Sequence, residues 1–301
     1  MYKRKVTKMG GAKRELLSKT NDKVFKEIFT RNKSCMADFL KCILNIPDEE
    51  FEYLEFLDTH TRKGSPLDGE YILDIKVKTK SHVIDVEMQV KRFPIMEQRI
   101  IVYLANMVKD QSCEGFKYKD IKKSVSIIIA AEHNVTDDER YFHKYSMRDE
   151  KDNSMFTDLL EINLLELQKL PKADDGTNLW DWLRFIKKTN NQEEMEMLAH
   201  ENPEIEKAYD ALQDLSNDEA IRHEAQQREM YLQNEMAINE ERYEQGIKEG
   251  IEKGIKEGKE QGIKEGKIEI AKNLLSIHLP LEQISNATGL SIDEIKELQS
   301  N

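Results

Sequence analysis

Two stretches of alternating apolar and polar residues, 71–79 and 82–91, are separated by only Lys80 and Ser81. Alternation with a period of two is typical of a strand with one buried face, and so short a connection predicts a β-hairpin. The apolar positions are Leu73, Ile75 and Val77 in the first stretch and Ile84, Val86 and Met88 in the second. We therefore expect an antiparallel pair with one face on the core and the other face charged.

The segments around this hairpin carry helical and strand-like patterns in turn. Apolar residues at helical spacing predict helices from residue 21, at 36–44, from Pro94 to about Cys113, and at 179–186. Apolar runs predict strands at 53–59, 124–131, 141–147 and 159–165. The run 124–131 is apolar along most of its length, which suits a fully buried central strand.

The charge of the chain is high and unevenly distributed. Charged residues make up 35% of the 301 residues and apolar residues 39%, which predicts one packed core plus a solvated helical extension. The net charge is −12, yet residues 1–33 hold 11 Lys/Arg against 3 Asp/Glu, a balance of +8. Such an arm can meet phosphate locally, although a flexible, soluble arm without a partner explains the same composition.

Several classes of protein are excluded by simple patterns. The longest apolar run is far shorter than the ~20 residues that span a bilayer, and no secretory signal follows the first methionine. Three cysteines without close pairing predict neither a disulfide framework nor a Cys-based zinc site, so the cytoplasm is the expected location. The histidines lack zinc spacing, and no phosphate-binding loop or dinucleotide fingerprint occurs.

The last third of the chain has a different composition. From about residue 193 to 266 it is charged and helical, with glycines four residues apart from Gly246 to Gly266. Residues 267–301 predict a small helical unit, with Gly289 ending one helix and Ser291 capping the next. The acidic last helix favours a structural or oligomerisation cap over DNA reading. The predicted parts are an arm at 1–19, a domain at 20–190, an extension at 191–266 and the terminal unit.

Three polar residues of the hairpin could carry chemistry. Glu87 and Gln89 are two residues apart and so share a strand face, while Asp74 has the parity opposite to its apolar neighbours. If the hairpin pairs, Asp74 and Glu87 can approach each other, and two carboxylates with a backbone carbonyl suit Mg²⁺. Taken alone, the pattern is also what a half-exposed strand shows, and Asp68, Glu70 and Asp85 are equally eligible carboxylates.

A longer set of segments resembles a known family. The block 21–29, the strands with Asp74 and with Glu87-Met88-Gln89, and a helix carrying Arg99, Tyr103 and Gln111 occur in this order. They are followed by 115–118 before a buried strand, and by the segment 165–170. Over about residues 20–190 the chain looks like the PD-(D/E)XK nuclease family of transposases, also called recombination-promoting nucleases. The resemblance implies a restriction-endonuclease-like α-β-β-β-α-β core with a mixed sheet, and a metal-dependent DNA endonuclease.

The resemblance also implies roles for single residues. Asp74 and Glu87 would hold Mg²⁺, with the Met88 carbonyl as a third ligand. Gln89 stands where the wider superfamily has its catalytic lysine, and it cannot carry that positive charge. The missing charge could come from Lys23, Lys26 or Lys91, and these lysines together with Arg99 are the candidate contacts to DNA.

Two other classes of function remain open at this level. One is a nuclease fold without activity that holds DNA or a protein partner, an interpretation that Gln89 favours. The other is an assembly protein whose function lies in residues 193–301 and whose charged helix forms a homo-oligomer. Metal-dependent cleavage would distinguish a nuclease from the first class, and truncation after residue 190 would distinguish it from the second.

Overall fold

The computed structural model describes residues 15–58, 74–90, 95–112, 117–187 and 191–300. The chain divides into two compact units, Met1–Glu229 and Met230–Asn301. The first unit contains the sheet and most of the helices. The second unit holds the greater part of one long helix and two short helices after it.

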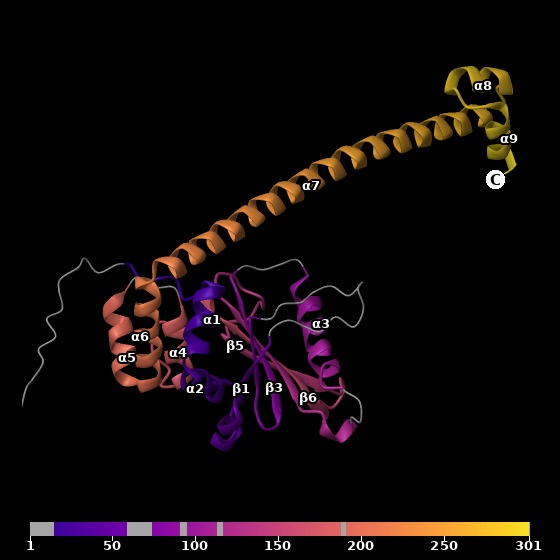
Figure 1. Cartoon of the computed structure of the whole chain (residues 1–301). Coiled ribbons are helices and arrows are strands. Elements are labelled where there is room, and N and C mark those ends of the chain that lie inside the picture. The colour runs from indigo at the N-terminus through magenta and orange to yellow at the C-terminus, as the bar shows by residue number, and fades with distance from the viewer. Residues whose placement is uncertain (1–14, 59–73, 91–94, 113–116, 188–190, 301) are drawn as a thin grey trace, which may run out of the picture. The chain divides into compact units, whose positions relative to one another are not determined.

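A mixed sheet forms the centre of the first unit (Figure 1). Its strands are β1 (Glu55–Leu57), β2 (Ile75–Lys78), β3 (His82–Gln89), β4 (Lys123–Ala130), β5 (Phe142–Arg148) and β6 (Met155–Glu166). Within the described residues their order is β1-β2-β3-β4-β6-β5. The predicted hairpin is β2–β3, which is antiparallel, whereas β3–β4 and β4–β6 are parallel. The α/β fold with a mixed sheet is therefore confirmed.

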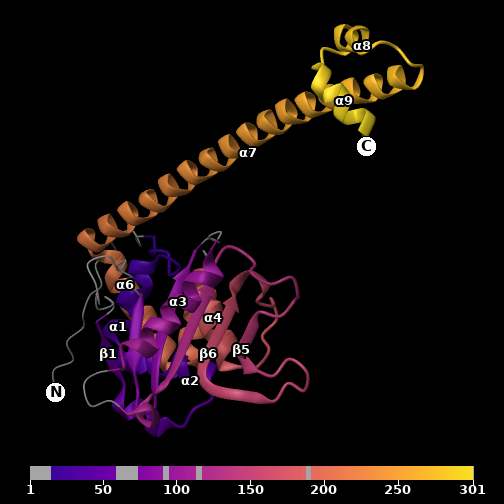
Figure 2. The same ribbon diagram turned by 90° about the vertical axis from the view of Figure 1, so that its right-hand side faces the viewer.

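Helices cover both faces of this sheet (Figures 1 and 2). One face packs against a layer formed by α1 (Asp22–Arg31), α2 (Lys33–Leu44), α4 (Asn178–Ile186), α5 (Gln192–Glu201) and α6 (Pro203–Asn217). The other face is covered by α3 (Met96–Lys109), which lies in the crossover from β3 to the parallel strand β4. In the described part of this unit, three short 3-10 helices lie at Asp48–Tyr53, Tyr118–Asp120 and Leu167–Lys169.

The first helix, α1, shows why these segments fold as they do. The side chain of Asn21 caps α1 by accepting from the backbone N–H groups of Lys23 and Val24. The apolar face of α1 is buried, and its Phe29 ring lies 5.4 Å from the ring of Trp182 on α4. Trp182 in turn donates from Nε1 to Asp38 on α2 at 2.8 Å, so its polar atom is satisfied inside the core.

The charged face predicted for the hairpin is not solvent-exposed. Along β3, every residue from His82 to Met88 is buried. Ile84, Val86 and Met88 face the large helical layer, and Val83 packs on the opposite side against Tyr103 and Met107 of α3. The expectation of one solvated face was wrong because β3 is a central strand with a parallel neighbour, and such strands are covered on both faces.

Helices beyond residue 190 contribute to the same core. The buried residues of α5 and α6 include Met195, Leu198, Ile205, Leu212 and Leu215, and all of them belong to the cluster that contains α1 and the hairpin. The compact unit accordingly continues to Glu229, past the boundary expected at residue 190. Residues 188–190 of the polar run that suggested the boundary lie outside the described residues, and the helices on both sides of it belong to this unit.

Within its described residues, the second unit consists of helices joined by short turns. Helix α7 (Glu219–Ser276) begins in the first unit and continues into the second, where α8 (Leu281–Thr288) and α9 (Ile292–Ser300) pack against its last turns. Gly289 ends α8 in the left-handed conformation, with φ of 74°. Ser291 and Glu294 form a capping box at the start of α9. Across the described residues, we find no helix that is both long and apolar enough to cross a membrane.

Candidate active site

Asp74 and Glu87 meet at the open end of the hairpin. The register that pairs Ile75 with Val86 places the next two residues of the strands side by side. The backbone N–H of Asp74 donates to Oε1 of Glu87 at 3.2 Å, and the backbone N–H of Met88 donates to Oδ2 of Asp74 at 2.8 Å. Each carboxylate is thus held by the backbone of the other strand, as the parity of the sequence predicted.

Gln89 and the Met88 carbonyl complete this group. The Gln89 amide donates from Nε2 to Oε2 of Glu87 at 3.3 Å. The Gln89 carbonyl accepts from the N–H of Ala131, beyond the end of β4, at 2.9 Å. Consecutive residues of a strand direct their backbone groups to opposite sides, so the Met88 carbonyl faces β2 and Asp74. The Met88 carbonyl is therefore on the same side of β3 as the Met88 N–H, which donates to Asp74.

The electrostatics of the pair favour a cation. Burial raises the pKa of Asp74 to about 6. Burial, followed by the charges of Asp85 and Asp74, raises the pKa of Glu87 well above its ordinary value. Glu87 is 6% exposed, so water stabilises its charge poorly. A divalent ion would relieve this repulsion, and oxygen ligands of this kind are those that Mg²⁺ prefers, so the residues fit such an ion.

A third carboxylate lies under the pair. Asp85 is fully buried on the same face as Glu87. Burial, followed by the charge of Asp74, raises the pKa of Asp85 well above its ordinary value, and Lys76 and the Ser126 hydroxyl act against this shift. Its neighbours in register are Lys76, whose Nζ lies 3.1 Å from Oδ2 of Asp110, and Ser126. Among the described residues, no group of three or more His, Cys, Asp or Glu side chains is arranged to hold a metal ion. An ion here would rely on the Asp74–Glu87 pair and a carbonyl.

The cations predicted for this site have different surroundings. Lys23 forms an ion pair with Glu224 at 2.7 Å. Burial has the dominant effect on the pKa values of Asp74 and Glu87, and it raises both. The charge of Lys26 lowers the pKa of Asp74, and the charge of Arg99 lowers the pKa of Glu87. Arg99 also donates to the Tyr103 hydroxyl at 2.8 Å. Lys91, Asp68 and Glu70 lie outside the described residues.

No pattern in the sequence predicted one ion pair whose charges act on Asp74. Arg228 of α7 binds Oδ2 of Asp22 through Nε at 2.7 Å and Nη2 at 2.6 Å. Both charges act on the pKa of Asp74, after the larger effect of burial. Asp22 belongs to the block 21–29, but Arg228 lies 206 positions later and outside any motif, so only the packing of α7 on α1 brings the two residues together.

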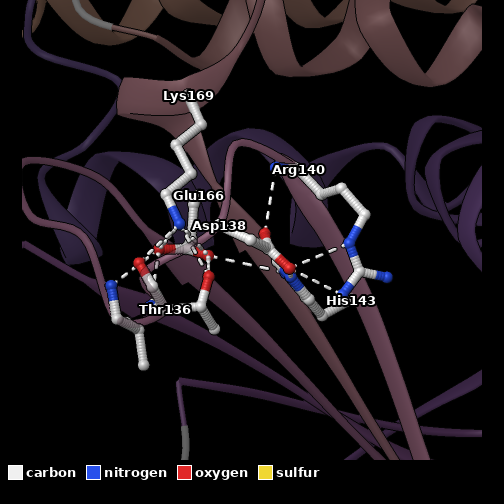
Figure 3. A network of polar contacts seen from close by, with 7 residues as sticks. Thr136, Asp138, Arg140, His143, Glu166 and Lys169 are labelled. Carbon is white, nitrogen blue, oxygen red and sulfur yellow. Dashed lines mark hydrogen bonds and ion pairs between the residues drawn. The ribbon is translucent and has the colours of Figure 1, made fainter.

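A second polar cluster lies at the ends of β5 and β6 (Figure 3). Glu166 is fully buried, and it accepts from the N–H groups of Val135 and Thr136, the Thr136 hydroxyl and Nζ of Lys169. Beside it, Nε2 of His143 lies 2.9 Å from Asp138. Although burial opposes it, these hydrogen bonds lower the pKa of Glu166. A carboxylate that is already satisfied in this way anchors the loop after β4, and we assign it a structural role.

Comparisons with known proteins agree with the geometry. A sequence model described as PD-(D/E)XK nuclease family transposase matches residues 19–241 of the chain. The matched region contains the Asp74–Glu87 pair, the helices α5 and α6, and the first turns of α7 with Arg228. Neither a search of curated proteins nor a search of solved structures gives a match.

Proposed function

The chain belongs to the PD-(D/E)XK nuclease family of transposases, and from this premise we propose that it is a Mg²⁺-dependent DNA endonuclease that hydrolyses phosphodiester bonds. The observation that supports this proposal most strongly is the Asp74–Glu87 pair. Its two carboxylates are linked through the backbone of adjacent strands, and both have raised pKa values. Ionisable groups that are perturbed in this way concentrate at functional sites.

Asp74, Glu87 and the Met88 carbonyl are the proposed holders of the ion. When bound, Mg²⁺ would supply positive charge beside the phosphate and acidify an attacking water. The hydrogen bonds already present keep both carboxylates in place before any ion arrives, which limits the reorganisation that binding requires.

The remaining side chains of the site would act on the substrate. Gln89 orients Glu87 through its amide, but it adds no positive charge. Lys26 and Arg99, whose charges act on the two carboxylates, could stabilise the phosphate. Lys23 could also bind the phosphate after releasing its ion-pair partner Glu224. Lys91 remains a candidate from the sequence. Contacts of this type would be sensitive to salt and indifferent to DNA sequence.

The test is cleavage of supercoiled and linear DNA in Mg²⁺ and in EDTA. We expect wild type to cleave only with the metal, and Asp74→Asn and Glu87→Gln to lose at least about a hundredfold in rate. Asp48→Asn is the matched control, because Asp48 is an exposed carboxylate that pairs with Lys41. Cleavage that survives both site substitutions would place the activity elsewhere and contradict the proposal.

A second candidate function is favoured by Gln89. Without a positive charge at this position, the fold could hold DNA without cutting it. Wild type that binds a duplex, yet cleaves nothing with Mg²⁺, Mn²⁺ or Co²⁺, would support this alternative and exclude the endonuclease.

A further inference from the structure

Helix α3 covers the face of β3 that carries Glu87. Side chains alternate along a strand, so Val83, Glu87 and Gln89 lie on one face of β3. On this face Val83 packs against Tyr103 and Met107 of α3, and α3 lies across this side of the sheet (Figure 2). The side chains of α3 that point at the sheet therefore meet the face that carries Glu87.

Packing near the amino-terminal end of α3 shows which of its residues lies level with Glu87. Ile100 packs against a small apolar cluster that contains Ile128 of β4. Ile128 is the register partner of Glu87 in the parallel pair β3–β4. Ile100 therefore lies level with Glu87, and its neighbour Arg99 lies in the same turn of α3.

Arg99 and Tyr103 form a pair on the side of α3 that meets the sheet. They are four residues apart, so they share one face of the helix. Nη2 of Arg99 donates to the Tyr103 hydroxyl at 2.8 Å, and Cζ of Arg99 lies 5.6 Å from the centre of the Tyr103 ring. Tyr103 is itself 6% exposed and packs on Val83. A guanidinium that is held by a buried hydroxyl and lies over a ring is restricted in its positions before any substrate binds.

The hairpin leaves this face short of positive charge. The Gln89 amide, which donates to Glu87 at 3.3 Å, is neutral. The hairpin lysine on the same face, Lys76, lies 3.1 Å from Asp110, and its side chain is 8% exposed. A phosphodiester that approaches the carboxylates adds a further negative charge, so a cation beside it lowers the free energy of the complex. Helix α3 places Arg99 where it can supply this charge.

We propose that Arg99 contacts the scissile phosphate beside Glu87 and supplies the positive charge that Gln89 lacks, and that Tyr103 is a positioning residue that holds the guanidinium there. The inference rests on the proposed endonuclease function and gives Arg99 a role distinct from that of the candidate lysines. A guanidinium suits this role because it stays charged and can donate two hydrogen bonds to one phosphate. Tyr103 acts through Arg99 and does not touch the DNA.

Moving the positive charge from α3 to β3 tests the role of Arg99 in the full chain. We expect Arg99→Gln to lower kcat for a linear duplex in Mg²⁺ about a hundredfold, because the charge that develops at the phosphate loses a partner. Adding Gln89→Lys restores a cation on the same face, and this double variant should recover to within about tenfold of wild type. A double variant as slow as Arg99→Gln, or an Arg99→Gln variant as fast as wild type, would overturn the proposal.

A double-mutant cycle tests the role of Tyr103. Tyr103→Phe keeps the ring and its packing and removes the hydroxyl. We expect kcat to fall about tenfold while KM stays within about twofold of wild type, because the guanidinium is less well positioned. In the Arg99→Gln background the same change should have no further effect, since no guanidinium is left to hold. An equal loss in both backgrounds would show a purely structural role and overturn the assignment of Tyr103.

Two substitutions away from the hairpin are the matched controls. Tyr209 of α6 is 5% exposed, and across the described residues its hydroxyl has no hydrogen-bond partner, so Tyr209→Phe removes a buried hydroxyl that holds nothing. Arg148→Gln removes the charge of an exposed arginine at the end of β5. We expect both variants to keep kcat/KM within about twofold of wild type. Losses as large as those of Tyr103→Phe and Arg99→Gln would show that the effects are not specific, and the proposal would fail.

Affinity for DNA without metal gives a readout that does not depend on cleavage. The probe is a fluorescein-labelled duplex of about 20 base pairs, titrated in EDTA at several NaCl concentrations. If Arg99 binds a phosphate, Arg99→Gln should reduce the slope of log affinity against log salt by about one. An unchanged slope would exclude the contact between Arg99 and phosphate.

The same measurements separate this inference from the proposed function. Wild type that binds without cleaving would exclude the endonuclease, and the slope alone would then decide whether Arg99 contacts phosphate. Wild type that cleaves while Arg99→Gln cleaves equally well would exclude only the role of Arg99. Wild type that neither binds nor cleaves would exclude both.

Discussion

At the scale of single residues, the candidate site contains several carboxyl groups whose charged form is destabilised by burial. Asp85 is fully buried and Glu87 nearly so, and burial is the largest cause of the raised pKa of each. Elsewhere in the same sheet Glu166 is also fully buried, but it accepts several hydrogen bonds. The contrast shows that this fold satisfies a buried carboxylate where stability alone is at stake. The raised pKa values of Asp74, Asp85 and Glu87 therefore mark the hairpin as the place where a bound cation would stabilise the charged forms of buried carboxylates.

Lys19 provides a test of buried charge away from the site. It is 5% exposed, with Nζ 3.5 Å from Sδ of Met195, and burial lowers its pKa from 10.5 to about 8. The unfolded chain holds this proton more tightly, so the charge opposes folding below pH 8 and the cost disappears as pH rises to 10.5. We expect Lys19→Met to raise the free energy of unfolding at pH 7 by up to about 3 kcal/mol. Urea denaturation between pH 7 and 10.5 measures it.

The exposed Lys172 is the control for this prediction. Lys172→Met should leave the free energy of unfolding unchanged within about 0.5 kcal/mol at each pH. If Lys19→Met raises the free energy of unfolding equally at pH 7 and at pH 10.5, then packing, rather than removal of the buried charge, is responsible.

The sequence predicted the residues of the site to different degrees. Parity along two strands was enough to bring Asp74 and Glu87 together, because a hairpin with a two-residue connection has few registers. The order of the motifs then indicated the family, which is confirmed. The pair of Asp22 and Arg228 could not be predicted, since it depends on how α7 packs on α1 across 206 residues and on no local pattern.

At the scale of elements, periodicity located the strands and helices better than it located their environments. The run at 124–131 was correctly expected to be a buried central strand, and it is β4. The alternation in β3 suggested a solvated face because Asp85, Glu87 and Gln89 are polar, whereas α3 covers that face. An alternating pattern shows which residues are polar, but it does not show whether they are exposed, because polar residues of a functional site can be buried.

The glycines of α7 allow a prediction about one element. A Cβ added at Gly250, Gly254 or Gly258 meets no atom within 4 Å, and these glycines lie inside a regular helix. Replacing all three by alanine should stabilise the helix by about 1 kcal/mol per site, because alanine loses less backbone entropy on folding. We expect amide hydrogen exchange across residues 246–266 to slow several-fold.

Gly289 supplies the opposite expectation in the same unit. Its φ is +74°, and a Cβ there would lie 3.4 Å from Nζ of Lys267. Gly289→Ala should therefore destabilise the small unit by about 1 kcal/mol, since alanine avoids the left-handed conformation.

The α7 prediction has its own contradicting outcome. Unchanged amide hydrogen exchange in the variant with alanine at Gly250, Gly254 and Gly258 would show that these glycines contact something else in solution, which contradicts a solvated helix.

At the scale of the whole molecule, the sequence suggested a division that follows composition. The predicted boundary at residue 190 divides the more apolar part of the sequence, at 20–190, from the more charged part, at 191–266. The compact unit continues to Glu229 because α5 and α6 each bury one apolar face and expose a charged one. The overall composition of such an amphipathic helix is charged, so composition alone does not show that its apolar face completes a core. Assembly through the C-terminal helices stays a prediction.

Two truncations follow from this organisation. We expect residues 1–229 to unfold cooperatively and residues 1–190 to be unfolded or aggregated. Ending the chain at 190 removes the core side chains Met195, Leu198, Ile205, Tyr209, Leu212 and Leu215. At about 1.5–3 kcal/mol for each buried side chain, the loss is comparable to the whole stability of about 5–15 kcal/mol of a typical domain. Thermal melting followed by circular dichroism measures both truncations.

Activity of the same two truncations connects the fold to the site. Residues 1–229 retain the Asp74–Glu87 pair and the start of α7 that packs on α1, so metal-dependent cleavage should persist without the second unit. A stable, cleaving chain that ends at 190 would show that the helices α5 and α6 are not needed. A folded but inactive 1–229 chain would instead mean that the second unit takes part in the reaction, because every residue proposed for the site is still present in it.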